Sequence, residues 1–347
     1  MKALVTGATG FIGSHIVREL VRTGHSVRAF TRRRSDRSAL AGMHVEIAEG
    51  DLADMKSLRR ACRGCDVVFH AAGMFTYWTD DKTLFDTMVT GTIDAVDAAA
   101  DAGVERFVLT SSSVTLGSST KAIPRDESDR MGAEPGPVYF RAKALQERAA
   151  FARAAERAMP LIAVLPTMTV GPNDAKLVPS NAVIVRYIED PYHVTFPGGC
   201  NIVGVRDVAR GHVLAAFKGK PGQRYVLGSE NLEWSLIHRI VSELCNISAP
   251  TMMVNETFSY LSATVLEWFA HMEDKPPALT RAQAETVGRF YWYRHDRASA
   301  LGYSPASARR ALADATAWLL SSGHIDPSIA RSIRPSPELR IAREVER

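Results

Sequence analysis

Tyr139 and Lys143 are the residues of this chain whose types and spacing most directly suggest chemistry. In Tyr139-Phe140-Arg141-Ala142-Lys143 they stand four positions apart, so a helix would place the phenol and the ammonium on one face. A free tyrosine titrates at about pH 10, and a neighbouring ammonium favours the phenolate, which makes the hydroxyl a better acid–base group at neutral pH. The pair therefore predicts proton transfer, with an ordinary pair on a helix surface as the alternative.

A run of hydroxyl side chains precedes this pair. Thr110-Ser111-Ser112-Ser113-Val114-Thr115 follows the apolar stretch Arg106–Thr110, which reads as a buried strand. One hydroxyl at such a strand end would point into a cleft and help to polarise a substrate carbonyl. Together with the phenol, it predicts acid–base catalysis at a carbonyl oxygen.

A glycine-rich turn stands at the start of the chain. Thr6-Gly7-Ala8-Thr9-Gly10-Phe11-Ile12-Gly13 follows the apolar Ala3-Leu4-Val5 and opens a stretch with apolar residues at helical spacing. In a strand–turn–helix unit, the first glycine allows the tight turn and the second lets the backbone approach a pyrophosphate. The third lets the helix pack closely on the strand. The helix N-terminus then presents N–H groups to the phosphates, so we predict dinucleotide binding.

The residues after the second predicted strand bear on which nicotinamide cofactor binds. That strand ends in Phe30-Thr31-Arg32-Arg33-Arg34, with an arginine where an acidic residue would bind the ribose hydroxyls of NAD. Guanidinium groups suit a 2′-phosphate, so we expect NADP(H) rather than NAD(H), unless this is only a solvated basic loop. We also expect Asp51 and Leu52 beside the adenine, and the small residues Ala71, Ala72 and Gly73 beside the cofactor backbone.

The elements that must position these groups alternate between strand and helix. Strands are predicted at 2–6, 26–31, 44–49, 66–70, 106–110 and 161–165, and several are continuously apolar, as in a parallel sheet covered on both faces. This pattern predicts an α/β fold, a Rossmann-type doubly wound parallel sheet with a smaller C-terminal substrate lobe. We place the dinucleotide-binding domain at 1–166, the lobe mainly at 167–325 with some completion of the sheet, and a poorly ordered tail at 326–347.

Composition narrows the class of protein. The net charge of +4 (42 basic minus 38 acidic residues) is too small to argue for nucleic acid. A strand directly after Met1-Lys2 leaves no room for a signal peptide, and no apolar run of about 18 residues indicates a membrane span, so we expect a cytoplasmic protein. Cys62 and Cys65 match C-x-x-C, but no second pair follows at zinc-site spacing; we expect unpaired thiols and no metal.

At this point the sequence resembles the extended short-chain dehydrogenase/reductase family over roughly residues 1–320. Within it, the chain is most similar to the dihydroflavonol reductase-like group and to the proteins labelled hopanoid-associated sugar epimerases. Besides the motifs above, the resemblance rests on these stretches: Asp66-Val67-Val68-Phe69-His70, Gly171-Pro172, Asp207-Val208-Ala209, Gly222-Gln223-Arg224-Tyr225-Val226-Leu227-Gly228 and Leu301-Gly302-Tyr303-Ser304-Pro305.

The resemblance implies a catalytic serine, tyrosine and lysine. The serine falls on Ser112, with Ser113 as the second choice, and Tyr139 and Lys143 take the other two roles. The expected cofactor-binding residues are Gly7, Thr9, Gly10, Phe11, Ile12, Gly13, Arg32, Asp51, Leu52, Ala71, Ala72, Gly73, Lys143 and Pro166. It also implies a homodimer formed through helices near 84–100 and 138–157.

Two departures from the family pattern stand out. Met88 occupies the place of an asparagine implicated in a water-mediated proton relay to the lysine, and methionine cannot hold a water in that way. Thr87 or Thr92 would have to serve instead, or the proton supply differs. Gly204 and Arg206 stand where relatives often have His and Asp. Both changes indicate chemistry or a substrate different from those of the sugar epimerases.

The leading hypothesis is NADPH-dependent reduction of a ketone or aldehyde, with Tyr139 donating the proton. A nucleotide-sugar epimerase or dehydratase with tightly bound NAD is the alternative, for which Arg186, Arg206 and Arg289 could bind the diphosphate. A non-catalytic NADP-sensing protein is a second alternative. We expect a small, apolar or aromatic substrate against Phe75, Tyr77, Trp78, Met88, Ser113 and Met168; simple loop packing would explain these residues equally well.

Overall fold

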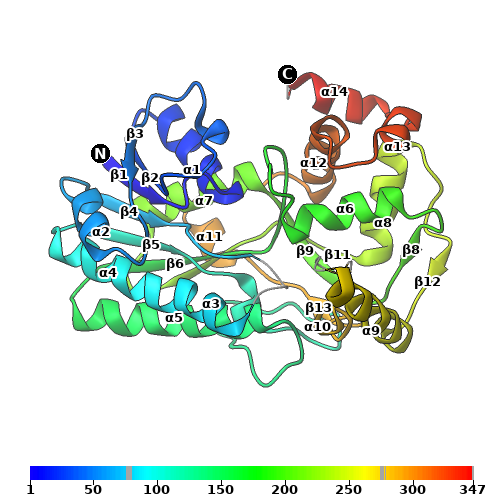
Figure 1. Cartoon of the computed structure of the whole chain (residues 1–347), viewed down its shortest axis with the longest axis horizontal. Coiled ribbons are helices and arrows are strands. Elements are labelled where there is room, and N and C mark those ends of the chain that lie inside the picture. Colours follow the sequence, from blue (N-terminus) through cyan, green and yellow to red (C-terminus); the bar gives the residue numbers. More distant parts are fainter. Residues whose placement is uncertain (76–79, 274–276, 278, 346–347) are drawn as a thin grey trace.

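A seven-stranded parallel sheet forms the left half of the molecule in Figure 1. The computed structural model describes residues 1–75, 80–273, 277 and 279–345. The strand order is β3-β2-β1-β4-β5-β6-β10, so the order reverses between β1 and β4, as in Rossmann folds. The strands are β1 (Lys2–Thr6), β2 (Ser26–Thr31), β3 (Glu46–Glu49), β4 (Val67–His70), β5 (Arg106–Thr110), β6 (Leu161–Pro166) and β10 (Arg224–Leu227).

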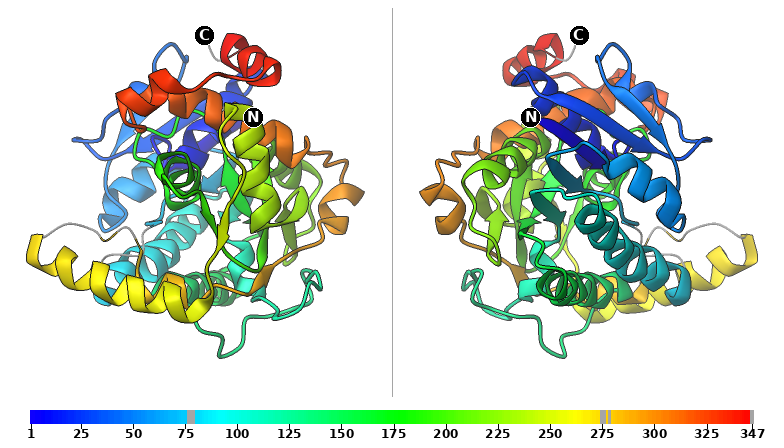
Figure 2. Two further views of the ribbon diagram at one scale, coloured as in Figure 1. Left: turned by 90° about the vertical axis from the view of Figure 1, so that its right-hand side faces the viewer. Right: turned by 90° about the vertical axis from the view of Figure 1, so that its left-hand side faces the viewer.

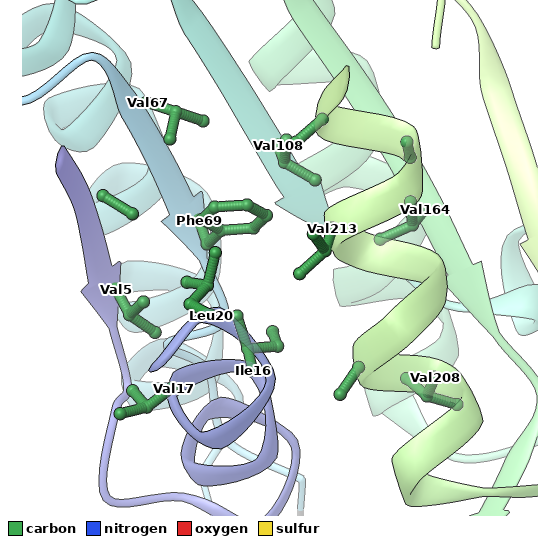
Figure 3. Packing of buried hydrophobic residues seen from close by; sticks show 14 of the residues in the cluster. Val5, Ile16, Val17, Leu20, Val67, Phe69, Val108, Val164, Val208 and Val213 are labelled. Atoms are coloured by element: carbon green, nitrogen blue, oxygen red, sulfur yellow. The ribbon is translucent and has the colours of Figure 1, made fainter. Parts of the chain in front are cut away.

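Helices cover both faces of this sheet. Figure 3 shows one face, where valines of the strands and Phe69 pack against Ile16, Leu20 and Val213 of two helices. This face is covered by α1 (Phe11–Arg22), α7 (Val205–Lys218) and α11 (Asp296–Ala300), and the other by α2 (Met55–Cys62), α4 (Gly91–Asp101) and α5 (Val138–Glu156). Helices exclude solvent from both faces of the sheet, so the side chains on both sides of the central strands are buried. These strands are therefore apolar throughout, which is the pattern that the sequence shows.

The second half of the molecule is a lobe with its own small sheet and core. Its strands pair in the order β11-β9-β13, with β7 on β9. Ile202 of β9, Ile237 of α8 and Leu312 of α12 belong to one buried core. The sheet consists of β7 (Met168–Val170), β9 (Gly199–Gly204), β11 (Glu230–Glu233) and β13 (Phe290–Tyr291), and β8 (Val194–Thr195) pairs with β12 (Met252–Met253). The main helices are α6 (Pro179–Glu189), α8 (Trp234–Cys245), α9 (Glu256–Glu273) and α12 (Ala308–Ser322).

Short helical turns lie in the connections. After β4 the chain forms α3 (Asp81–Phe85) and a π-helical turn, η2 (Asp86–Thr90), which leads directly into α4. The remaining short elements are the 3₁₀ turns η1 (Ser38–Leu40) and η3 (Ser113–Leu116) and the helix α10 (Arg281–Ala284). Within the described ranges, none of the helices combines the length and the hydropathy that crossing a bilayer requires.

The predicted architecture is confirmed, with small shifts at strand ends. Strands 2–6, 26–31 and 106–110 have the predicted bounds, whereas β3 begins at Glu46, β4 at Val67, and β6 runs on to Pro166. β10 belongs to the second part of the chain and completes the sheet beside β6.

The C-terminal segment differs from the prediction of a poorly ordered tail. It forms α13 (Pro327–Ser332) and α14 (Pro337–Val345), drawn in red in both views of Figure 2. Leu339 and Ala342 are fully buried in the core of the lobe, together with the largely buried Ile333. The polar composition of this segment hides a narrow apolar stripe, which is enough to dock a short helix.

Candidate active site

A cavity of about 870 Å³ lies where the carboxyl ends of the sheet strands meet the lobe. The sheet contributes the start of α1, the loops after β4 and β5, and the beginning of α5, while the lobe contributes parts of α6, α8, α9 and β13. The lining is mostly apolar. Ligands bind at this edge of doubly wound sheets, at the point where the strand order reverses, so the fold places the cavity where a substrate and a cofactor would meet.

Ser112, Tyr139 and Lys143 all line this cavity. Tyr139 is in the first turn of α5, which begins directly after Pro137. The ring of a proline clashes with a helical turn on its N-terminal side, so the helix starts at this point. The phenol shares a hydrogen bond with the side chain of Ser112, and its ring lies against Phe75 with the ring centroids 5.0 Å apart. The three predicted catalytic residues are therefore brought together, and Ser112 rather than Ser113 is the serine that contacts the phenol.

The direction of the pKa shift of Tyr139 differs from the expectation. Burial raises the pKa of the phenol above its usual value, and the hydrogen bond from Ser112 opposes this only in part. The sequence analysis expects Lys143 to lower this pKa, whereas desolvation is the largest influence on it in the structure. Tyr139 is therefore a neutral phenol at neutral pH, which is the form that can give up a proton.

Lys143 lies one helical turn after Tyr139 and is almost completely buried. Its ammonium donates to the Thr110 carbonyl at 3.0 Å and to Gln146 Oε1 at 2.9 Å. Burial lowers the pKa of Lys143 to about 8, although the carboxylate of Glu147 acts in the opposite direction. The ammonium is therefore charged at neutral pH, but it loses its proton more readily than a surface lysine.

The glycine-rich turn has the geometry that a bound pyrophosphate needs. Gly7 adopts a φ of +67°, and a Cβ on Gly13 would lie 2.1 Å from the Gly7 carbonyl oxygen, so neither position tolerates a side chain. No side chain caps the N-terminus of α1 at Gly10, and its first turn holds no acidic residue. The N–H groups of that turn remain for an anion. Phe11 and Ile12, which follow directly, line the cavity.

The other predicted cofactor residues divide between the cavity and its surroundings. Ala71, Gly73, Lys143 and Pro166 line the cavity, whereas Ala72 packs its backbone against Gly7, with its Cα and N 2.7 Å from the place of a Cβ there. Arg32, Asp51 and Leu52 are outside the cavity, near the ends of β2 and β3, and Arg32 and Asp51 are exposed. A dinucleotide is a long molecule, and only its nicotinamide half would occupy the cavity.

The predicted substrate residues have different places. Phe75, Ser113 and Met168 line the cavity. Tyr77 and Trp78 lie outside the described residues. Met88 does not line the cavity: it is fully buried behind the site, packed with Leu84, Tyr139 and Ala142. The prediction for Met88 is wrong because η2 turns its side chain towards the core.

The lobe contributes an aromatic wall that the sequence analysis misses. Tyr187, Phe196, Trp234 and His238 line the cavity, and the rings of Tyr187 and His238 stack with their centroids 4.2 Å apart. Burial lowers the pKa of His238 to about 4, so its imidazole is neutral. Tyr291 of β13 also lines the cavity. These residues come from three distant parts of the chain and have no motif that could have marked them.

Comparison with known proteins agrees with this geometry. Residues 3–228 match the family described as the NAD dependent epimerase/dehydratase family. The chain is 31% identical to a putative dihydroflavonol 4-reductase of Synechocystis sp. over 92% of its own length and 95% of that protein. It is 32% identical to sterol demethylase protein B of Methylococcus capsulatus, with 94% and 100% covered. Among solved structures, that of gox2253 superposes with a TM-score of 0.82 at 35% identity, covering 93% of this chain and 99% of that one.

Proposed function

Since this chain belongs to the NAD dependent epimerase/dehydratase family and is an enzyme of the extended short-chain dehydrogenase/reductase type, we propose that it reduces a carbonyl group with NADPH. The observation that carries the proposal is the placement of the Tyr139 phenol, hydrogen-bonded to Ser112 and one helical turn before Lys143, on the wall of a mostly apolar cavity. A phenol so placed can donate its proton to a carbonyl oxygen, which is what reduction requires.

Ser112, Tyr139 and Lys143 have different roles in the proposed reaction. When bound, a reduced nicotinamide supplies a hydride to the carbonyl carbon. The Ser112 hydroxyl holds the carbonyl oxygen, and Tyr139 gives that oxygen its proton, so that the C=O bond becomes CH–OH. The Lys143 ammonium stabilises the phenolate that remains on Tyr139. Because these groups are fixed on α5 and at the N-terminal cap of η3, the fold holds the reactants in place, which contributes much of the acceleration.

The cavity supports an uncharged ring compound as substrate. Its lining is mostly apolar and includes aromatic side chains from the lobe as well as Ser112, Tyr139 and Lys143. Two relatives are named for a dihydroflavonol and a sterol, both of which are ring compounds. The size of the cavity, about 870 Å³, is at the upper end of ligand pockets, and leaves room for such a ring system beside a nicotinamide.

The preference for NADPH rests on the arginines after β2. Arg32, Arg33 and Arg34 are exposed directly after the strand whose end faces the adenosine ribose in this fold. With no acidic side chain at that strand end, the position suits a 2′-phosphate.

A nucleotide-sugar substrate is less well supported. Of the three arginines that could bind a diphosphate, Arg206 pairs with Asp314 at 3.2 Å, and Arg289 donates to Ser118 and lies 3.7 Å from Glu134. Arg186 is the one of the three that lines the cavity. A diphosphate carries at least two negative charges and would be poorly solvated by the apolar lining.

Fluorescence titration with NADPH and NADH, followed by turnover of a panel of aryl ketones and of UDP-glucose, tests the proposal. We expect tighter binding of NADPH and oxidation of NADPH by at least one ketone. Interconversion of UDP-glucose with co-purified NAD would establish the epimerase instead. Binding of NADPH without turnover of any substrate by the protein would favour a sensing role.

A further inference from the structure

A chain of buried hydrogen bonds runs behind Lys143, on the side away from the cavity. Lys143 donates to Gln146 Oε1 at 2.9 Å, and Gln146 Nε2 donates to Thr92 Oγ1 at 2.8 Å. Thr92 in turn contacts the Met88 carbonyl at 2.6 Å and His70 Nε2 at 3.0 Å. His70 Nδ1 lies 2.9 Å from Thr6 Oγ1. The chain therefore joins α5, α4 and η2 to the carboxyl ends of β4 and β1.

The direction of each hydrogen bond in this series follows from two groups with fixed roles, the Lys143 ammonium and the Met88 carbonyl. An ammonium can only donate, so the amide oxygen of Gln146 must face Lys143 and its NH₂ group must face Thr92. A carbonyl can only accept, so the single hydroxyl proton of Thr92 goes to Met88. His70 must then donate from Nε2 to Thr92 and accept at Nδ1 from Thr6.

All the side chains in this series of hydrogen bonds are buried, and His70, Thr92 and Gln146 have no more than 1% of their surface exposed. A buried polar group without a partner costs free energy, so a chain that satisfies all of its members holds each of them in one orientation. The hydroxyl protons of Thr6 and Thr92 and the Nε2 proton of His70 are each donated to a partner within the chain. The chain therefore fixes the position of Lys143, and it does not supply protons to the site.

We propose that Gln146 is a positioning residue for Lys143: it holds the ammonium against the Thr110 carbonyl and leaves its third N–H for the cavity. The participation of Lys143 in a reaction rests on the proposed function, whereas the anchoring of its ammonium by Gln146 does not. Gly73 lies on the cavity side of this group, with the place of its Cβ 4.0 Å from Lys143 Nζ. A dinucleotide ribose passing over Gly73 would meet this N–H.

The groups that face Lys143 explain why an amide is suited to this position. Glu147 raises the pKa of the ammonium from the same helix, while the His70 imidazole is kept neutral by burial and by Lys143, with a pKa lowered to about 3. Tyr139 faces the cavity one turn earlier and is neutral. Gln146 adds an acceptor for the ammonium without adding a charge.

Two nearly isosteric substitutions of Gln146 change the acceptor in opposite ways. Gln146→Leu removes it, and Gln146→Glu replaces it with a carboxylate. The pKa of Lys143 can be followed by NMR of the Nζ ammonium in ¹⁵N-lysine-labelled protein without cofactor, the signal being assigned by its loss in Lys143→Arg. We expect the titration midpoint to fall by about one pH unit in Gln146→Leu and to rise by a similar amount in Gln146→Glu.

Gln223→Leu is the matched control, because it makes the same change at an exposed position and should leave the midpoint unchanged. Midpoints that do not move, or that move in the same direction in both variants, would overturn the proposal. If a variant does not fold, ¹⁵N NMR of the wild-type histidines decides: we expect His70 to be neutral with its proton on Nε2, and a proton on Nδ1 would refute the chain. Failure of the protein to bind NADPH would refute only the proposed function, because these measurements use no cofactor.

Discussion

Arg224 and Glu147 form a buried ion pair directly behind the loop that carries Ser112. Arg224 Nη1 lies 2.8 Å from Glu147 Oε1, and both side chains are about 5% exposed. The other carboxylate oxygen of Glu147 accepts hydrogen bonds from Ser111 at 2.5 Å and Thr115 at 3.2 Å. The pair therefore ties β10 and α5 to the residues on both sides of Ser112, the proposed catalytic serine.

Breaking this ion pair on one side should be costly. Glu147→Leu leaves the Arg224 guanidinium buried without its counter-ion, so we expect the free energy of unfolding to fall by about 3–5 kcal/mol in urea denaturation. The double variant Glu147→Leu/Arg224→Met should recover a large part of this loss, because it removes both charges. A double variant less stable than Glu147→Leu would contradict this account.

Tyr139→Phe removes the proposed proton donor and keeps the ring. We expect the rate of ketone reduction to fall by about a hundred- to ten-thousand-fold, while NADPH binding and the free energy of unfolding change little. Steady-state NADPH oxidation and fluorescence titration measure the two effects. Tyr192→Phe, at a tyrosine that is 68% exposed, is the control and should behave as wild type. A retained rate in Tyr139→Phe would exclude this phenol as the acid.

The affinity for NADPH should depend on pH through Lys143. Burial lowers the pKa of Lys143 from 10.5 to about 8, so the free protein has a charged ammonium below that pH and a neutral amine above it. The charged form is the better donor to the ribose, and we expect the dissociation constant measured by fluorescence to rise as the pH increases from 7 to 9. Lys143→Met should bind more weakly and show no such rise; an identical pH profile in this variant would assign the effect to another group.

Arg32→Ala tests the choice of cofactor. Loss of one charge-assisted hydrogen bond to a 2′-phosphate should weaken NADPH binding by about 10- to 100-fold and leave NADH binding nearly unchanged. Arg60→Ala, which removes an exposed arginine of α2, controls for the loss of general positive charge. If Arg32→Ala weakens both cofactors equally, the 2′-phosphate is not its partner.

Gly13→Ala tests the packing of α1 on the glycine-rich turn. The added methyl would lie 2.1 Å from the Gly7 carbonyl oxygen, and the backbone must shift to accommodate it. We expect loss of measurable NADPH binding and a lower melting temperature in calorimetry. Gly132→Ala makes the same change where nothing lies within 4 Å and should be neutral. Normal binding by Gly13→Ala would mean that the turn does not hold the pyrophosphate.

The sheet and the proximity of Ser112, Tyr139 and Lys143 could be predicted because their signals are local. Each strand is a short apolar run, and the glycine turn and Tyr139-to-Lys143 spacing depend on residues within one turn or helix. The direction of the Tyr139 pKa shift could not be predicted in this way. Sequence spacing gives the proximity of Lys143 but not the burial that raises the pKa of the phenol. This burial comes partly from Leu84 and Met88, which pack against Tyr139 from a distant part of the sequence.

The aromatic wall and the role of Gln146 could not be predicted for a different reason. Trp234 and His238 reach the cavity only because α8 packs across the lobe, and nothing near them in the sequence indicates a ligand. Gln146 follows Lys143 by three residues and reads as an ordinary polar helix residue. Its function depends on Thr92, 54 positions away, and on the π-helical turn that brings the Met88 carbonyl to Thr92.

The pairing of β10 with β6 also bears on how this protein is made. β6 ends at Pro166, but its partner on the outer side runs from Arg224 to Leu227, so nearly sixty residues separate two adjacent strands. During synthesis, the N-terminal half can collapse early, yet β6 remains an open sheet edge until residue 227 has left the ribosome. Unpaired edges invite aggregation, and a fragment ending at residue 166 would keep that edge permanently. Only the first part of the lobe, from β7 to β9, lies between the two strands and leaves the ribosome while the sheet is incomplete; α8 and α12, which form much of the lobe core, follow after β10.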